Sequence, residues 1–438
     1  MSEVVIVSAV RTAIGGFGGG LKEQTAAKLG SLVIKDVLKR AGLKPKSGAK
    51  LLGYGPAALS GGGLSELERK YYDWPDNLKE VQVDEVIMGN VLQAAQGQNP
   101  GRQAMIYAGL PKETPGFTVN KICGSGLKAV IAGAQSILLG DADVVIAGGM
   151  ESMSNAPYAM TRARWGYRMD LTGKGEVLDL MVYDGLWELY YGYHMGVTAE
   201  NIAIKYGITR EEQDKLGLMS HQRAMAAIKD GTFKQEIVPV VSPQKKGDPL
   251  VFDTDERPME TTLEKMAKLS PVFKKDGTVT AGNASGQNDG SAFVLIMSAE
   301  KAKEYGYQPY AKWLAGAEAG VDPRIMGIAP AYAVPKAIKR AGLKLSDMDI
   351  MECNEAFAVQ NLAVIKEIEK QAGSKVDMSK WNPLGGAIAF GHPNGASGAR
   401  ICMFAMKEMA RLGGKYAFFS SCCGGGLGVA TVIENLKR

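Results

Sequence analysis

Cys123 stands where a β-prone run gives way to a helix. Residues 117–122 favour a strand, a small-residue turn follows, and residues 127–139 form a good helical segment. A thiol at that point meets unpaired backbone N–H groups and the positive end of the helix dipole. We therefore predict a nucleophile whose pKa is lowered from about 8.5 toward roughly 3.5–7.5. The alternative is a small buried hydrophobic residue in a tight turn.

Three further candidates lie near the other end of the chain. His392 stands in a Gly-His-Pro-Asn-Gly turn, Asn354 opens Asn-Glu-Ala-Phe-Ala, and Cys422 precedes Cys-Gly-Gly-Gly. Glycine turns let the backbone approach a ligand closely. Together these residue types suit acyl transfer with carbanion chemistry. One cysteine attacks a thioester while the histidine takes its proton, the second cysteine moves another proton, and backbone N–H groups stabilise an oxyanion.

Composition excludes several other classes of protein. The chain has 438 residues, 46% hydrophobic and 22% charged, which is typical of a soluble protein with two or three domains. A net charge of +5 without a basic run argues against nucleic acid, and we expect no membrane span. The five cysteines have no Cys-x-x-Cys spacing, so neither zinc nor a disulfide framework is expected. With no visible signal peptide, a cytoplasmic location follows as an expectation.

An internal repeat organises the chain. The six residues Lys39–Lys44 recur identically as Lys339–Lys344, each copy ends an amphipathic segment, and an Ile-Met pair follows both, at Ile87 and Ile350. Two stacked βα halves would bring the Cys123 and His392 turns to a shared centre. We predict an N-terminal half from 1–151 and 288–308, a loop domain over the site from 152–287, and a C-terminal half from 309–438. The repeat also exposes an insertion at about 45–82. Glycines 15–20 come too late after the first strand for a dinucleotide fingerprint.

The whole chain resembles the thiolases, and most closely the acetyl-CoA acetyltransferases among them. The motifs that carry the resemblance are Asn120-x-x-Cys123-x-Ser125-Gly126, Gly148-Gly149-Met150-Glu151-Ser152-Met153-Ser154, Asn354-Glu355-Ala356-Phe357, Gly391-His392-Pro393 and Cys422-x-Gly424-Gly425-Gly426. The resemblance implies a five-layered αβαβα sandwich of two duplicated halves plus the loop domain. It also implies a reversible Claisen condensation of two acetyl-CoA to acetoacetyl-CoA and CoA, without a metal or redox cofactor, in a homotetramer.

The resemblance also assigns roles within the motifs. Cys123 is the acylated nucleophile, and His392 activates it and polarises the thioester oxygen with a water held by Asn354. Cys422 moves the α-proton of the second acyl-CoA, and the N–H groups of Cys123 and Gly424 form the other oxyanion hole. Cys353 and Cys402 are interpreted as structural.

Substrate contacts follow from the same resemblance. The pair His194-Met195 is typical of short-chain thiolases, in which it closes the acyl pocket. Further positions fall where the family lines that pocket (Phe273, Met326, Phe357), contacts the pantetheine arm (Ala281, Ser285), or meets the CoA nucleotide (Arg257, Lys265, Lys268). The last three are candidates only, because the usual His-Pro-Arg and Lys-Leu-Arg-Pro are replaced here by Arg-Pro-Met and Lys-Leu-Ser-Pro.

Three other interpretations stay open at this stage. The first is a 3-ketoacyl-CoA thiolase of broader chain length, which the His-Met pair argues against. The second is a non-catalytic acyl-CoA carrier, which should lack one of the catalytic residues. The third is a decarboxylating or carrier-linked synthase, which would favour one cysteine with two histidines or with a histidine and an asparagine. Two activated thiols in one site also suggest that Cys123 and Cys422 form a reversible disulfide under oxidation.

Overall fold

A computed structural model describes residues 2–48, 64–169, 173–244 and 247–437. Its main sheet is mixed and continuous, in the order β16-β17-β18-β15-β1-β14-β7-β5-β6, and β2 pairs with β14 beside it; the other strands form two-stranded sheets. The two halves of this sheet join only where β1 meets β15, at Val5 opposite Lys312 and Ile6 opposite Ala311. The N-terminal half contains β1 (Val4–Arg11), β5 (Glu85–Gly89), β6 (Gly116–Val119), β7 (Val144–Ser152) and β14 (Asn288–Ser298), and the C-terminal half contains β15 (Ala311–Gly320), β16 (Ile350–Cys353), β17 (Tyr416–Cys423) and β18 (Leu427–Asn435).

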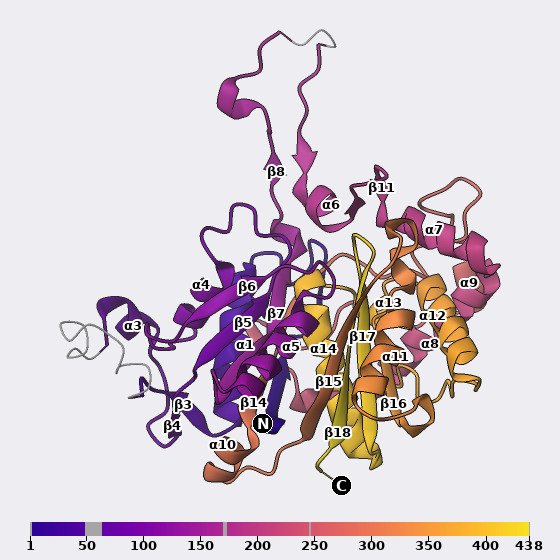
Figure 1. Cartoon of the computed structure of the whole chain (residues 1–438). Helices are drawn as coiled ribbons and strands as arrows, with labels where there is room; N and C mark the ends of the chain where they lie inside the picture. The colour runs from indigo at the N-terminus through magenta and orange to yellow at the C-terminus, as the bar shows by residue number, and fades with distance from the viewer. Residues whose placement is uncertain (1, 49–63, 170–172, 245–246, 438) are drawn as a thin grey trace.

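Helices cover both halves and fill the space between them (Figure 1). α5 (Ser125–Leu139) and α14 (Asn394–Leu412) pack against each other and against strands of both halves, so they form the middle layer. α1 (Ala26–Arg40) and α4 (Pro100–Tyr107) cover the outside of the N-terminal half, while α11 (Pro330–Arg340) and α12 (Ala358–Ala372) cover the C-terminal half. The predicted five-layered sandwich is therefore confirmed.

The repeat is visible in the packing of equivalent elements. The two identical six-residue segments end α1 and α11, and the strand after each carries the Ile-Met pair, in β5 and in β16. β6 runs parallel to β5, and Trp381 makes a parallel bridge to Met351 of β16 at the matching place. The turn after β6 leads to α5 and carries Cys123. The segment after Trp381 leads to α14 and carries His392.

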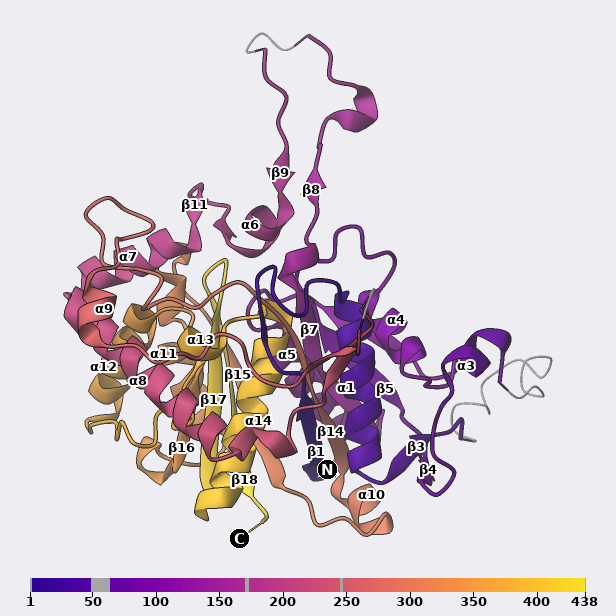
Figure 2. The same cartoon turned by 180° about the vertical axis from the view of Figure 1, so that it is seen from behind.

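Residues 153–287 leave the sheet between β7 and β14. The part before α8 (Arg210–Lys229) runs over the upper edge of the sandwich, and α8 then crosses the face that Figure 2 shows and packs against α12. The segment contains β8 (Tyr158–Ala159), β9 (Leu178–Asp179), α6 (Leu180–Gly185), β10 (Trp187–Glu188), β11 (Tyr193–His194), α7 (Met195–Tyr206), α8 (Arg210–Lys229), β12 (Val240–Ser242), β13 (Leu250–Phe252), α9 (Leu263–Ala267) and the 3₁₀ turns η1 (Met153–Asn155), η2 (Ala163–Trp165) and η3 (Thr232–Gln235). The hairpin of β8 and β9 projects away from the body (Figure 1).

The insertion packs onto the N-terminal half where it is described. It contributes β3 (Leu43–Pro45), α3 (Glu66–Tyr71) and β4 (Lys79–Val81). Trp74 is buried and donates its indole N–H to the carbonyl of Gly109 at 3.1 Å. The ring of Tyr71 packs against that of Tyr107, with the ring centroids 5.1 Å apart. Its aromatic residues therefore pack on the body of the same chain. The glycine-rich part, 49–63, lies outside the described residues. The remaining elements are β2 (Gly15–Gly16), α10 (Ala299–Glu304), α13 (Ala387–Phe390), η4 (Pro323–Ile328) and η5 (Leu345–Asp347).

One helix is apolar enough to resemble a membrane span. Residues Ile122–Leu139 have a mean hydropathy of 1.5 over 18 residues and pass the length and composition test for a membrane span. They coincide with the turn at Cys123 and α5, and 61% of the stretch is buried inside the protein. A helix in the middle of five layers is apolar on several faces because both sheets cover it.

Glycines allow the backbones of the two halves to meet at the start of the middle layer. A Cβ on Gly126 of α5 would lie 2.6 Å from the carbonyl oxygen of Gly395 in α14, and one on Gly89 would lie 2.8 Å from the same oxygen. A Cβ on Gly149 of β7 would also collide with that oxygen. Real Cβ atoms do not approach backbone oxygens this closely, so only glycine permits the contact.

We predict that Gly149→Ala destabilises the protein by about 1–3 kcal/mol or prevents folding, because a backbone carbonyl cannot move aside as a side chain can. Chemical denaturation of the purified protein measures the change. Gly320→Ala at the end of β15 is the matched control, since its Cβ would enter open space, and we expect it to stay within about 0.5 kcal/mol. Equal losses in both variants would contradict the close-approach argument.

Candidate active site

Hydrogen bonds within the turn between β6 and α5 fix the position of Cys123. The preceding residue, Ile122, has a φ of 48°, and its N–H donates to Oδ1 of Asn120 at 3.0 Å. Ser125 accepts from the N–H of Lys121 at 2.8 Å and donates to the carbonyl of Ile122 at 2.6 Å. The thiol therefore lies just before the first turn of α5, as the sequence predicts.

The prediction of a lowered cysteine pKa is wrong for the free protein. Burial and, to a smaller extent, the nearby carboxyl of Glu151 raise the pKa of the Cys123 thiol to about 12, although the backbone N–H groups of Gly424 and Cys123 oppose the shift. Desolvation of the thiolate outweighs the helix end, because the sulfur is buried and no cation among the described residues contributes to the shift. The two N–H groups nevertheless converge on the sulfur, where an acyl oxygen would need donors.

His392 is held as a neutral imidazole. Its Nδ1 lies 2.7 Å from Oγ of Ser397, and that hydroxyl donates its only proton to the carbonyl of Pro393 at 3.1 Å. Oγ therefore accepts from Nδ1–H, which leaves the lone pair on Nε2. Burial, assisted by the positive charge of Arg400, lowers the pKa of His392 to about 3. The ring is a proton acceptor that stays uncharged at rest.

Asn354 and Cys422 lie next to these two residues but deeper in the protein. The side-chain amide nitrogen of Asn354 lies 3.4 Å from both ring nitrogens of His392. Cys422 stands near the end of β17 and is completely buried, and burial followed by the neighbouring sulfur of Cys123 raises its pKa well above the usual range. Both cysteines are free thiols. The adjacent Cys423 faces Gly124 instead: its sulfur would lie 2.5 Å from a Cβ there.

A cavity of about 70 Å³ collects most of the predicted site residues. Its lining includes Cys123, His392, Gly424, His194, Met195, Ser285, Phe273, Met326 and Phe357. Asn354 and Cys422 are buried outside this lining, and Ala281, Arg257, Lys265 and Lys268 lie beyond it. Residues from both halves and from the segment between them therefore meet at one small cavity, although their roles stay predictions.

Aromatic rings form one wall of this cavity. The imidazole of His194 stacks on Phe273 with centroids 4.7 Å apart, and Phe273 meets Phe357 edge-on at 6.3 Å. His194 also caps α7 by accepting from the N–H of Gly196 at 3.1 Å, and Met195, the first residue of α7, is buried beside it. Burial lowers the pKa of His194. These contacts close the cavity on this side.

The candidates for the CoA nucleotide occupy two different settings. Arg257 donates to the backbone carbonyls of Ile388 at 3.1 Å, Ala284 at 3.1 Å and Ala281 at 3.4 Å. Its guanidinium therefore braces the 281–285 turn that lines the cavity. Lys265 and Lys268, in and just after α9, are exposed to solvent.

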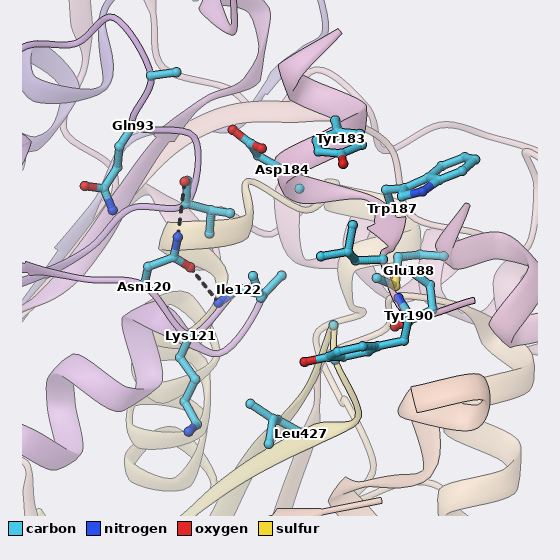
Figure 3. Close-up of a pocket in the computed structure, with 17 residues that line it drawn as sticks. Gln93, Asn120, Lys121, Ile122, Tyr183, Asp184, Trp187, Glu188, Tyr190 and Leu427 are labelled. Carbon is cyan, nitrogen blue, oxygen red and sulfur yellow. Dashed lines mark hydrogen bonds between the residues drawn. The ribbon is translucent and has the colours of Figure 1, made fainter. Parts of the chain in front are cut away.

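A larger hollow of about 810 Å³ opens beside the small cavity (Figure 3). Gly185, Met195 and Gly424 line both, so these residues form the partition between the two. Around the hollow stand Tyr183, Trp187 and Tyr190 together with the carboxylates of Asp184 and Glu188.

Three residues support the site but received no role from the sequence. Glu151 accepts from Asn90 at 2.7 Å, from the N–H groups of Val91 and Leu92 at 3.0 and 3.2 Å, and from Gly395 at 2.8 Å. It thereby ties the His392 turn to the N-terminal half. The others are Ser397 and Arg400, which follow His392 on α14. The only sequence signal for Arg400 is a charge directly before the apolar stretch 401–406.

Comparison with known proteins shows the family of this chain. The N-terminal domain of thiolase matches residues 4–51 and 75–300, and the C-terminal domain matches residues 307–435. The chain belongs to the thiolase family. The gap between 51 and 75 falls inside the insertion. As a thiolase, the chain has the fold that its sequence predicts.

Relatives resemble this thiolase over its whole length. It is 50% identical over 434 residues to an acetyl-CoA acetyltransferase of Syntrophomonas wolfei, with 99% of each chain covered, and 50% identical over 435 residues to one of Cupriavidus necator, covering 99% of this chain and 100% of the other. It also superposes on the crystal structure of the Bacillus anthracis acetyl-CoA acetyltransferase with a TM-score of 0.86, at 41% identity and 99% coverage of both chains.

We predict that Glu151→Gln lowers the free energy of unfolding by about 1–3 kcal/mol or more. Both oxygens of Glu151 accept from N–H groups, so the amide nitrogen of the glutamine would face a donor and lose a hydrogen bond. Urea denaturation measures the loss. Glu352→Gln is the matched control: Glu352 is equally buried, burial raises its pKa well above the usual range, and neither carboxylate oxygen has a hydrogen-bond partner among the described residues. A Glu151→Gln protein as stable as the control would contradict the bridging role.

We also predict how Cys123 reacts with iodoacetamide. Because burial raises its pKa to about 12, the thiolate fraction grows about tenfold per pH unit, and the alkylation rate should rise without a plateau between pH 6 and about 9. Mass spectrometry of the Cys123 peptide after timed alkylation measures this, with Cys123→Ala as the blank. A plateau below pH 8 would mean that the free enzyme does lower the thiol pKa.

Proposed function

We propose that this thiolase is an acetyl-CoA C-acetyltransferase, which converts two acetyl-CoA to acetoacetyl-CoA and CoA and also catalyses the reverse reaction. The observation that carries the proposal is the meeting of Cys123, His392 and the N–H of Gly424 at one small cavity, in a chain about half identical to named acetyl-CoA acetyltransferases over its full length. Acetyl-CoA, acetoacetyl-CoA and CoA are then its substrates.

The first half-reaction transfers an acetyl group to Cys123. The sulfur attacks the thioester carbonyl while its proton passes to Nε2 of His392, which carries the lone pair. The carbonyl oxygen gains negative charge and lies between the N–H groups of Cys123 and Gly424, which converge on the sulfur. The tetrahedral intermediate collapses, CoA leaves with the proton returned by His392, and an acetyl-cysteine remains. Starting from a neutral thiol and a neutral imidazole avoids burying an ion pair in the resting enzyme.

The second half-reaction forms the carbon–carbon bond. Cys422 first passes its thiol proton to Nε2 of His392, and the resulting thiolate takes a proton from the methyl carbon of the second acetyl-CoA. The protonated Nε2 and a water on Asn354 then donate to the thioester oxygen. The carbanion attacks the acetyl carbon, the Cys123 sulfur leaves, and His392 returns its proton to that sulfur, which restores both thiols. Because Cys422 is buried next to Cys123, one sulfur can act on the carbon that attacks the group carried by the other. Each placed proton-transfer group contributes about 10²–10⁴ in rate.

Cavity size supports the short-chain assignment over a broad 3-ketoacyl-CoA thiolase. Stacked rings of His194 and Phe273 and the buried Met195 border a cavity of only about 70 Å³. We further propose that no metal or redox cofactor takes part, and that the protein works as a homo-oligomer in the cytoplasm. Exposed apolar side chains on the β8–β9 hairpin, such as Trp165 at 83% and Met169 at 89%, support contact with a further chain.

We predict that the purified protein cleaves acetoacetyl-CoA with added CoA and that Cys123→Ala lowers the rate at least about a thousandfold, because it removes the nucleophile. Loss of the 3-ketoacyl-CoA absorbance measures turnover. Cys402→Ala is the matched control, since this cysteine is fully buried in α14 away from the cavity and should keep its activity.

The same assay run with 3-ketohexanoyl- and 3-ketodecanoyl-CoA separates the alternatives. Turnover confined to the C4 substrate supports the short-chain enzyme. Equal turnover of the long chains would reassign the protein as a broad 3-ketoacyl-CoA thiolase. Absence of turnover on every substrate, with acyl-CoA still bound, would favour a carrier.

A further inference from the structure

A buried cation lies directly behind the candidate active site. Arg400, in the second turn of α14, is 1% exposed, and its guanidinium lies between the rings of Phe404 and Phe390, at 5.0 and 5.7 Å from their centroids. Its Nη2 donates to the side-chain oxygen of Asn354 at 3.3 Å, while Nε and Nη1 have no partner among the described residues. A buried charge with so few partners costs stability, so its retention calls for a functional reason.

Within the described parts of the chain, no carboxylate is hydrogen-bonded to this guanidinium. The nearest candidate is Glu352 of β16, whose two oxygens have no hydrogen-bond partner among the described residues. Burial raises the pKa of Glu352 well above the usual range; the charge of Arg400 opposes this shift, and the neighbouring carboxyls of Glu355 and Glu408 add to it. The side chain of Asn354 is therefore the polar group to which the charge of Arg400 is directed.

We propose that Arg400 is a positioning residue that fixes the orientation of the Asn354 amide in the reaction described above. A guanidinium can only donate, so the oxygen of Asn354 must face Arg400. The amide nitrogen must then face His392, and it lies 3.4 Å from each nitrogen of that ring. With the amide flipped, the oxygen would face the lone pair on Nε2 and could not donate toward a thioester oxygen.

The consequence concerns only one of the two half-reactions. Acetylation of Cys123 uses the N–H groups of Cys123 and Gly424, which Arg400 does not touch. Carbon–carbon bond formation uses the donor on Asn354. Loss of Arg400 should therefore slow condensation and thiolysis while acetyl-cysteine still forms. This inference rests on the proposed function, since both half-reactions are defined by it.

A double-mutant cycle tests the proposal. Arg400→Met removes the donor and the charge and should lower the thiolysis rate by about tenfold to a hundredfold, below the 10²–10³ that loss of a whole oxyanion donor costs. In the Asn354→Ala background the same change should cost less than about threefold, because the group that Arg400 orients is gone. Trapping of radiolabelled acetyl-enzyme should give near wild-type acetylation in Arg400→Met.

Each result decides the matter. Equal losses from Arg400→Met in both backgrounds, or slowed acetylation, would overturn the proposal, because Arg400 would then act independently of Asn354. Failure of the wild type to turn over any substrate would instead remove the proposed function.

Arg223→Met is the control for destabilisation. Arg223 donates to the carbonyls of Trp381, Asn382 and Met378, and the effect of its loss should be additive with that of Asn354→Ala. If Arg400→Met fails to fold, Arg400→Lys takes its place in the cycle, since its single ammonium cannot reproduce the planar fork.

Discussion

The N-terminal ends of α5 and α14 meet with only glycine between their backbones, and the rest of the site depends on this contact. Gly126 and Gly395 bring the two helices together, and Gly89 and Gly149 let the strands of the N-terminal half approach the same carbonyl. The turn before α5 carries Cys123 and the turn before α14 carries His392, so contact between the two helix ends brings these residues together. Glu151 then fixes the junction with hydrogen bonds to both halves. A single methyl group at this junction would separate the nucleophile from its base.

Desolvation governs the electrostatics of the site. It raises the pKa of Cys123 and lowers that of His392, so both groups rest uncharged in a buried cavity. Donors are already in place around the atoms where charge will develop, and no solvent has to reorganise when it does. Arg400 contributes to the same arrangement from behind, since its fixed positive charge also helps to keep His392 neutral. The site therefore stabilises the charge that develops in the transition state and holds no thiolate–imidazolium pair at rest.

The sequence predicted the fold because its signals were local or repeated. The six-residue repeat and the paired glycine turns indicated two stacked halves, and the strand-to-helix position of Cys123 was correct. Its pKa was not predictable, because it depends on how much protein covers the sulfur and not on the neighbouring residues. Ser397 and Arg400 were missed for a similar reason: they stand on a helix whose apolar character hid them, and their partners, His392 and Asn354, are fixed by tertiary packing.

The positions of the catalytic groups along the chain also set an order of assembly. Cys123 belongs to the first third of the sequence, whereas Cys422 and Gly424 lie in the last two strands, β17 and β18, or between them. During synthesis the N-terminal half leaves the ribosome first, and domains generally begin to fold in that order. Until the final hairpin pairs with β15, the thiol of Cys123 lacks both the layer that buries it and the N–H of Gly424. The nascent chain therefore carries an uncovered cysteine of ordinary reactivity for most of its synthesis. The active site is complete only when β17 and β18 have folded.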